Sequence, residues 1–468
     1  MFDDARKRWW ALYVLCSGVL MIVLDTTIVN VALPSIREDL KFTETSLVWV
    51  VNAYMLTFGG FLLLGGRLGD LFGHRRLFLL GLTFFTLASL ACGLAQTRVL
   101  LIAARALQGL GGAVVTAVAL SLIMDLFTGT SERAKAMGIY GFVCSAGGSI
   151  GVLLGGFLTT TLNWHWIFLV NLPIGVVVYV ASTRLLPRDI VKAGGMRLDV
   201  AGAVTITASL MLAVYAIVNG EVLGWRSVQL LGMLGGALAL LVAFLAIESK
   251  VREPLMPLGL FRRRNIAVAN VVAVLWAAGM FAWFFISALY LQLVLGYNAM
   301  QVGLAFLPAN LIMAAFSLGL SATIVMRFGF RVPLAVGLLL AALGLAWFAR
   351  APLDGRFLVD VLPGMALLGV GAGVALNPLL LGAMSDASSE DSGLASGLVN
   401  TAFMMGGALG LAVLASIAAA GNEGLRATGA TDLAALNGGY HLAFLGGGLC
   451  AALAAVIGGT SMRTRLGP

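Results

Sequence analysis

Long apolar segments, separated by short polar ones, restrict the folds open to this chain. A helix needs about 20 apolar residues to cross the hydrocarbon core of a bilayer, and fourteen segments of this kind can be distinguished. They lie at 11–34, 47–66, 77–96, 101–125, 135–158, 165–185, 199–219, 228–248, 266–292, 299–325, 332–350, 358–384, 394–420 and 438–461. Charged residues make up only 11% of the chain, against roughly 25% in a soluble domain. We therefore expect an all-α integral membrane protein with 14 transmembrane helices.

Basic residues are distributed unevenly between the polar segments. Of the 29 lysines and arginines, 21 fall on the side that holds the N-terminus, 7 on the other side and 1 inside an apolar segment. Cytoplasmic loops carry the excess of Lys and Arg, so both termini are expected in the cytoplasm. The Ala-, Gly-, Leu- and Arg-rich composition is typical of a GC-rich bacterial genome, which predicts a bacterial cytoplasmic (inner) membrane. The net charge of +8 then reflects loop topology and does not indicate nucleic-acid binding.

Weak internal similarity predicts two related halves. RALQGLGGAV (105–114) resembles MALLGVGAGV (365–374) at an offset of 260, and two further short pairs are offset by 256. Transporters built from parallel repeats place their site near the membrane midplane, between the halves. We expect an N-terminal six-helix bundle at 1–190, two additional helices at 191–255 and a C-terminal six-helix bundle at 256–468.

Two charged side chains fall deep inside apolar segments, Asp25 and Arg105. A charge at the centre of a bilayer costs at least about 2.5–3.5 kcal/mol, and such residues usually line an ion or substrate pathway or pair with one another. Burial disfavours a charged carboxylate and a neighbouring cation favours it. An Asp beside an Arg, in a cavity that alternates between dry and wet, can therefore bind a proton on one side and release it on the other. The alternative is a static ion pair that fixes two helices.

The most specific motif is GGRLGDLFGHRR at 65–76. Its glycines fall four apart and would give a helix end a bare edge for close packing; they are Gly65, Gly69 and Gly73. Its charged residues can form a cytoplasmic ion network that breaks and re-forms between two conformations; they are Arg67, Asp70, Arg75 and Arg76. The alternative is that the last two arginines only anchor the topology.

This segment closely resembles the signature loop of the major facilitator superfamily. Further segments narrow the resemblance to its fourteen-helix drug:proton antiporter family, and they are LDTTIVNVALPSI (24–36), RALQGLGGA (105–113), WHWIFLVNLPIG (164–175) and LYLQLVLGYNAMQVGLAFLP (289–308). The resemblance implies a major facilitator fold, a monomer, and export of drugs or antibiotics in exchange for protons. It also implies that Asp25 and Arg105 take part in proton coupling.

The fifth apolar segment departs from the family pattern. The family's antiporter motif usually carries a Gly-Pro step followed by two glycines, whereas GGSIGVLLGG (147–156) has Val152 at the position of the proline. The glycines expected to support close packing and bending remain, and they are Gly147, Gly148, Gly151, Gly155 and Gly156. Without the proline kink, the motif is weaker as independent evidence for antiport.

The ninth segment is rich in aromatic residues, which suits an apolar site of broad specificity. Helical periodicity turns about half of these side chains toward lipid or other helices. The candidates for the substrate cavity are Thr26, Asn30, Asn52, Tyr54, Gln108, Trp276, Phe284 and Gln292. Thr26 and Asn30 could instead form hydrogen bonds between helices.

Signatures of other protein classes are missing from the sequence. It has no GxxxxGK[ST] phosphate loop and no HExxH, and its four cysteines lack metal-ligand or redox spacing. We therefore expect no enzyme activity, no metal and no cofactor other than the proton as coupling ion. A membrane receptor or lipid-modifying protein would need an extramembrane domain or a catalytic constellation, and neither is present.

These observations together predict a proton-coupled exporter of small lipophilic or cationic molecules that works by alternating access in the lipid bilayer. Two alternatives within the same fold stay open. One is a dedicated exporter of a single metabolite made by its own host, and the other is an uncoupled facilitator or importer of a small nutrient.

Overall fold

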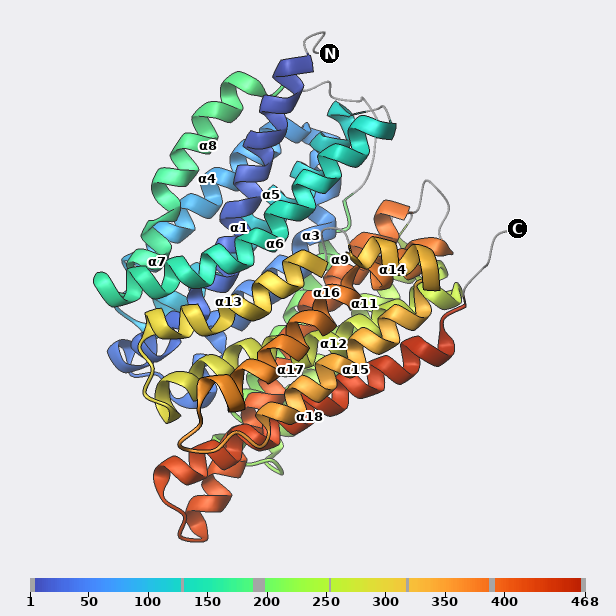
Figure 1. The fold of residues 1–468 in the computed structure, drawn as a ribbon. Coiled ribbons are helices and arrows are strands. Elements are labelled where there is room, and N and C mark those ends of the chain that lie inside the picture. The colour runs from blue at the N-terminus through green and yellow to red at the C-terminus, as the bar shows by residue number, and fades with distance from the viewer. Residues whose placement is uncertain are drawn as a thin grey trace.

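A computed structural model describes residues 5–127, 130–187, 198–251, 254–316, 320–386 and 392–463. Within these ranges the chain is helical and contains no β-strand, which confirms the predicted all-α class. The long helices lie side by side, and those of the N-terminal part are tilted relative to those of the C-terminal part (Figure 1). The boundary predicted near residue 190 lies outside the described residues, and the division into domains stays a prediction.

The first part of the chain forms six long helices and two short ones (Figure 1). The long helices are α1 (Ala5–Leu40), α3 (Trp49–Phe72), α4 (His74–Gly93), α5 (Arg98–Leu126), α6 (Thr130–Thr161) and α8 (Asn171–Leu185). The short ones are α2 (Glu44–Leu47) and α7 (Trp166–Leu169). We call this set the N-terminal half.

Two further long helices, α9 (Val200–Val218) and α11 (Val228–Lys250), follow, with the short α10 (Gly220–Leu223) between them. The remaining α-helices, the C-terminal half, are α12 (Arg264–Leu289), α13 (Ala299–Ala315), α14 (Ser321–Phe328), α15 (Arg331–Phe348), α16 (Leu362–Ser385), α17 (Ser392–Ala427) and α18 (Asp432–Ser461). A 3-10 turn at Leu258–Arg262 and π-helical turns at Tyr290–Val294 and Phe357–Val361 complete the order.

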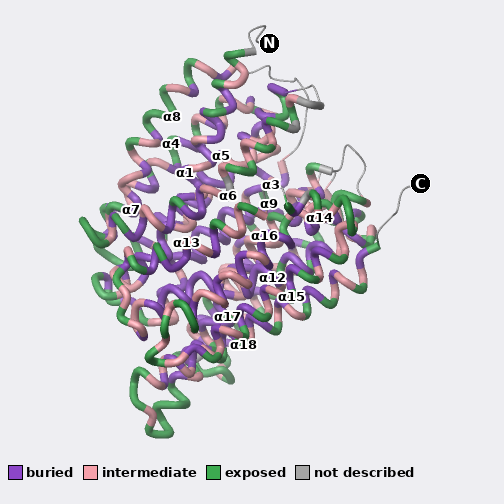
Figure 2. The backbone as a smooth tube through the Cα atoms, in the orientation of Figure 1, coloured by how far each residue is buried: buried purple, intermediate pink, exposed green. Residues whose placement is uncertain are grey.

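The predicted apolar segments all correspond to helices. Thirteen helices of the described chain are long and apolar enough, by length and composition, to cross a membrane. The remaining predicted segment, 299–325, contains the 17-residue α13 together with α14. The two segments at 199–219 and 228–248 are separate helices, α9 and α11. Buried positions lie mainly where helices face one another, with exposed positions on outer faces and loops (Figure 2).

The pair α9 and α11 packs on one side of the contact between α3 and α17. A methyl group built at Gly60 of α3 would clash with Thr207 of α9, and Ser416 of α17 donates a 3.3 Å hydrogen bond to Ile217 O of α9. The helix α11 attaches to α9, with Ser209 Oγ donating to Ala237 O at 2.7 Å. The inserted helix α9 therefore contacts both halves.

The two halves also meet where α6 faces α13, and this contact lies near one end of both helices. We call the end where α1 begins and α18 ends the terminal end. At the opposite end, Met300 N donates to Thr160 Oγ1 at 3.2 Å. Toward the terminal end, Phe142 and Ile150 of α6 are exposed, and a methyl group at Gly141 would meet nothing within 4 Å. The hydrogen bond between α6 and α13 therefore lies at the opposite end.

Candidate functional site

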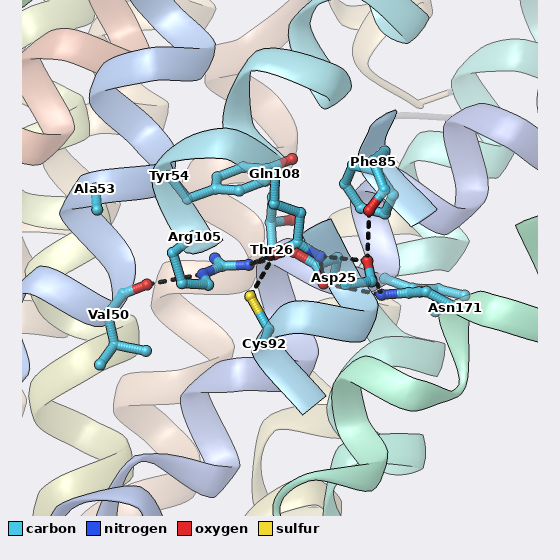
Figure 3. A network of polar contacts seen from close by, with 12 residues as sticks. Asp25, Thr26, Val50, Ala53, Tyr54, Phe85, Cys92, Arg105, Gln108 and Asn171 are labelled. Atoms are coloured by element: carbon cyan, nitrogen blue, oxygen red, sulfur yellow. Dashed lines mark hydrogen bonds and ion pairs between the residues drawn. The ribbon is translucent and has the colours of Figure 1, made fainter. Parts of the chain in front are cut away.

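The two intramembrane charges predicted from the sequence form an ion pair in the N-terminal half (Figure 3). Arg105 Nη1 of α5 lies 2.5 Å from Asp25 Oδ2 of α1. The Asp25 side chain is 0% exposed and that of Arg105 1% exposed. A pair this deeply buried is strongly destabilised when one partner is removed, because the other charge is left uncompensated.

Gln108 connects the two charges and belongs to the same cluster. Its Nε2 donates to Asp25 Oδ1 at 2.7 Å, and its Oε1 accepts from Arg105 Nη1 at 2.6 Å. The spacing of three residues places Gln108 and Arg105 on one face of α5. Fully buried, Gln108 lies inside the helical bundle.

Two residues that the sequence analysis did not select complete the shell around Asp25. Asn171 Nδ2 of α8 donates to Asp25 Oδ1 at 3.0 Å. Ser89 Oγ of α4 accepts from Gln108 Nε2 at 2.8 Å and donates to Phe85 O at 2.9 Å. Asn171 lies within the WHWIFLVNLPIG segment, so an amide inside an apolar run was the available signal.

Arg105 is also held from the side of α3. Its Nε donates to Val50 O at 2.9 Å, and its guanidinium carbon lies 4.4 Å from the centre of the Tyr54 ring and 5.6 Å from that of Phe168. Such cation–π contacts strengthen when the cation is desolvated. Small residues bring α5 close to its neighbours, since a methyl group at Gly111 would lie 2.7 Å from Phe85 N.

The glycines of the 65–76 motif support close packing of α3 on α5. A methyl group at Gly65 would lie 3.1 Å from Val114 Cα, and one at Gly69 would lie 2.6 Å from the His74 ring. Gly73, which ends α3, has a φ of 95°, a conformation that strains any residue with a Cβ. The motif thus forms a tight turn between α3 and α4.

The charged residues of this motif reach several neighbouring elements. His74 Nε2 lies 3.1 Å from Asp70 Oδ1, and His74 Nδ1 lies 3.1 Å from Asp125 Oδ2 of α5. The sequence analysis gave no role to His74 or Asp125. Arg75 donates to Thr183 O of α8 at 2.5 Å.

Two further arginines of the motif also have interactions. Arg67 donates a hydrogen bond to Pro254 O, in the segment that leads into the C-terminal half. Arg76 also interacts with neighbouring groups. Whether these groups break and re-form between conformations stays a prediction.

Three glycines of the fifth apolar segment lie along α1. A methyl group at Gly151 would lie 2.9 Å from Leu24 O, one at Gly155 2.7 Å from Ile28 O, and one at Gly147 2.8 Å from Val23. Their four-residue spacing gives α6 a continuous bare edge. This edge contacts α1 on the turns that flank Asp25.

The neighbouring face of α6 contacts the other half of the molecule. A methyl group at Gly156 would lie 2.6 Å from Ala299 O of α13, and one at Gly303 of α13 would lie 2.9 Å from Val152 O. Val152, at the position of the family proline, is buried. Gly148 has open space around it.

The polar residues predicted for the substrate cavity have other partners in this structure. Asn52 Nδ2 of α3 donates to Ala408 O of α17 at 2.8 Å, and Gln292 Nε2 donates to Val31 O of α1 at 3.1 Å. These two bonds join the halves. Thr26 Oγ1 donates to Val23 O at 2.7 Å within α1, and Asn30 Nδ2 bonds weakly to the preceding turn.

The aromatic candidates of the ninth segment pack mainly on other aromatic side chains. Trp276 lies 5.3 Å, centre to centre, from Phe403 of α17 and lines a small apolar cavity with Trp283. Phe284 stacks on Phe306 of α13 at 5.5 Å. Tyr54 belongs to the Arg105 environment instead. A substrate role for any of these residues stays a prediction.

The fold and the cluster together define the class of protein. Long apolar helices in two halves, with a hydrogen-bonded ion pair buried at the middle of one half, are the architecture of a membrane transporter. The model of the Major Facilitator Superfamily matches residues 15–411. The chain belongs to this superfamily, whose members are multi-pass membrane transporters and not enzymes.

Three similar proteins are named for drug resistance or for antibiotic export. The chain is 38% identical to the puromycin resistance protein pur8 of Streptomyces alboniger, over 93% of this chain and 87% of the relative. It is 40% identical to the cephamycin export protein CmcT of Amycolatopsis lactamdurans, over 88% and 86%. It is 36% identical to the multidrug resistance protein Stp of Mycobacterium tuberculosis, over 86% and 74%.

A solved structure shares the fold. It is a bacterial homologue of the human lysosomal transporter Spinster, in an inward-facing and unoccupied conformation. The comparison covers 98% of each chain with a TM-score of 0.67 and 16% sequence identity. At this identity the likeness establishes the major facilitator fold.

Proposed function

We propose that this protein exports small lipophilic or cationic compounds of the antibiotic type in exchange for protons. The observation that carries the proposal is the Asp25 carboxylate, which is buried against Arg105 and accepts hydrogen bonds from Gln108 and Asn171. An ionisable group held this way inside a membrane protein is the expected form of a proton relay. The antibiotic resistance and export functions in the relatives' names support the substrate class.

Protonation of Asp25 is the chemical step of the proposed cycle. Neutralising the carboxylate removes the charge that Arg105 Nη1 faces at 2.5 Å, so the strongest polar link between α1 and α5 is lost. The proton binds from the outer side, substrate leaves, the carrier reorients, and the proton is released inside. One proton crossing 100 mV supplies about 2.3 kcal/mol, enough for a roughly fiftyfold gradient of a neutral solute.

The glycine edge of α6 offers a route from this step to the contact between the halves. It follows α1 beside Asp25 at Leu24 and Ile28, and its next face contacts Ala299 of α13. A shift of α1 after protonation therefore moves α6 against α13. Opening this contact gives access to the other side, in the manner of rocking bundles.

We further infer the orientation and setting. The excess of Lys and Arg near the terminal end supports a cytoplasmic location for that end and both termini, in a bacterial cytoplasmic membrane. With this orientation, the contact between α6 and α13 lies on the outer side. The transporter acts as a monomer.

A susceptibility test separates this proposal from an importer or facilitator. A bacterial host without its own efflux pumps would express the protein, and the minimal inhibitory concentrations of puromycin, a cephamycin and the dye ethidium would be measured. Export predicts higher inhibitory concentrations for at least one compound, and Asp25→Asn should abolish the gain. Protection from only one compound would favour a dedicated exporter, and protection that survives Asp25→Asn would argue against proton coupling at this residue.

A further inference from the structure

A second pair of acidic side chains is buried at the terminal end of the inserted helices. Asp199 immediately precedes α9, and Glu248 lies in the last turn of α11. Both residues are only 3% exposed. Neither belongs to the Asp25 cluster, and neither was selected from the sequence.

Each carboxyl group uses one oxygen to accept a backbone hydrogen bond. Asp199 Oδ1 accepts from Gly202 N at 2.7 Å and so caps α9. Glu248 Oε2 accepts from Met256 N at 3.0 Å. The two remaining oxygens, Asp199 Oδ2 and Glu248 Oε1, are buried and receive no donor from the part of the chain that the structure describes.

Those two oxygens face each other. A methyl group built at Gly202 would lie 2.5 Å from Asp199 Oδ2 and 2.9 Å from Glu248 Oε1, so both oxygens flank one point. The two side chains are within hydrogen-bonding reach of each other. Ionised carboxylates only accept hydrogen bonds, so a bond between them requires a carboxyl proton.

We propose that Asp199 and Glu248 form a second protonation site, in which one proton is shared between the two carboxyl groups. Two buried carboxylates in contact cannot both be ionised without strong repulsion. One shared proton removes this repulsion and gives each oxygen a partner. In aspartic proteases two carboxyl groups share a proton for the same reason.

The charged surroundings leave the pair in need of that proton. Among the described residues, Arg67 of α3 is the cation whose charge acts on Glu248. Its guanidinium also donates to Pro254 O. One cation can balance only one of the two carboxylates, so the other still needs a proton. The elements packed around the pair contribute apolar side chains, with Leu255 buried against Leu64 and Ala203.

The shared proton also holds three parts of the protein together. The pair joins the start of α9 to the end of α11, and Glu248 holds the Met256 backbone. The same segment accepts the hydrogen bond from Arg67 of the 65–76 motif at Pro254 O. Loss of the proton is expected to loosen segment 254–256 from both the inserted helices and this motif.

Infrared spectroscopy of the purified full-length protein tests the shared proton without any transport assay. Near neutral pH, the wild type should show the carbonyl band of a buried protonated carboxyl group. Glu248→Gln should lose this band, because an amide can donate to Asp199 Oδ2 without a proton. Exposed Glu423 gives the matched control Glu423→Gln, which should keep the band. An unchanged band in Glu248→Gln would overturn the proposal.

The pH dependence of thermal unfolding provides a second test, because a hydrogen bond without a titrating proton would not make the melting temperature depend on pH. A folded state that keeps a proton which the unfolded chain releases becomes less stable as pH rises. As pH rises above about 4, the ordinary carboxyl pKa, the wild-type melting temperature should therefore fall more steeply than that of Glu248→Gln. Asp199→Asn, which can still cap α9, should show the same flattened profile. Parallel profiles in the wild type and both variants would also overturn the proposal.

Discussion

Asn171 donates a 3.0 Å hydrogen bond to Asp25, which joins α8 to the charged centre of α1. With Arg105 and Gln108 on α5, this bond surrounds the carboxylate with donors from three directions (Figure 3). Every one of these donors favours the ionised carboxylate. The site is therefore arranged so that taking up a proton must displace existing interactions.

Asn171→Leu should slow proton-coupled transport. The change removes the 3.0 Å hydrogen bond to Asp25 Oδ1 and leaves the buried carboxylate with one donor fewer. A hydrogen bond to a charged group contributes about 1.5–3 kcal/mol, so a loss of stability of this order is expected as well. Dye efflux from vesicles and the melting temperature measure the two effects, and values equal to those of the wild type would exclude Asn171 from the site.

The single variant Arg105→Gln should be less stable than the double variant that combines Arg105→Gln with Asp25→Asn. The single change leaves the Asp25 charge buried without its partner, at a cost of about 3–5 kcal/mol, whereas the double variant carries neither charge. Melting temperatures in detergent compare the two. The double variant should regain stability but not proton coupling, and equal stability of both variants would show that the pair is not held as an ion pair.

Gly156→Leu should impair transport far more than Gly148→Leu. A side chain at Gly156 would meet Ala299 O, whereas one at Gly148 meets open space. Overpacking of this kind typically costs about 1–3 kcal/mol. In Gly156→Leu it would destabilise the contact between α6 and α13. Efflux rates at matched expression decide the point, and equal rates for the two variants would mean that this contact is not needed in the cycle.

His74→Ala and Asp125→Asn should have effects on stability that do not add. His74 links Asp70 to Asp125, and a protonated ring can donate to both. Each single change breaks the bridge between α4 and α5, so the double variant should unfold close to the temperature of the more affected single one. Additive shifts in melting temperature would show that the two residues act independently.

The sequence allowed the architecture to be predicted because membrane spans are long and uniform. Each predicted segment is mainly helical over its described residues, and the separate α9 and α11 follow from the 50 residues at 199–248. The Asp25–Arg105 pair was predictable for a related reason, since an isolated charge in an apolar run needs a partner. The spacing of Gln108 from Arg105 likewise placed it on the same helix face.

Other features depend on packing between distant segments and leave little trace in sequence. Asn52 and Gln292 look like cavity residues, yet they bond to backbone oxygens across the two halves at Ala408 and Val31. Asp199 and Glu248 sit at the ends of apolar segments, where charges are common. Only the folded positions of α9 and α11 bring these two carboxyl groups together.

The most direct test of the central claim is exchange of substrate for protons in vesicles. Purified protein would be reconstituted and loaded with ethidium or puromycin, whichever gives resistance in cells, and efflux would be followed under an imposed pH gradient. The account predicts that reversing the gradient reverses net flux in the wild type. In Asp25→Asn, downhill exchange should persist but no longer respond to pH. Gradient-driven flux in Asp25→Asn at the wild-type rate and pH dependence would contradict the assignment of Asp25 as the proton site.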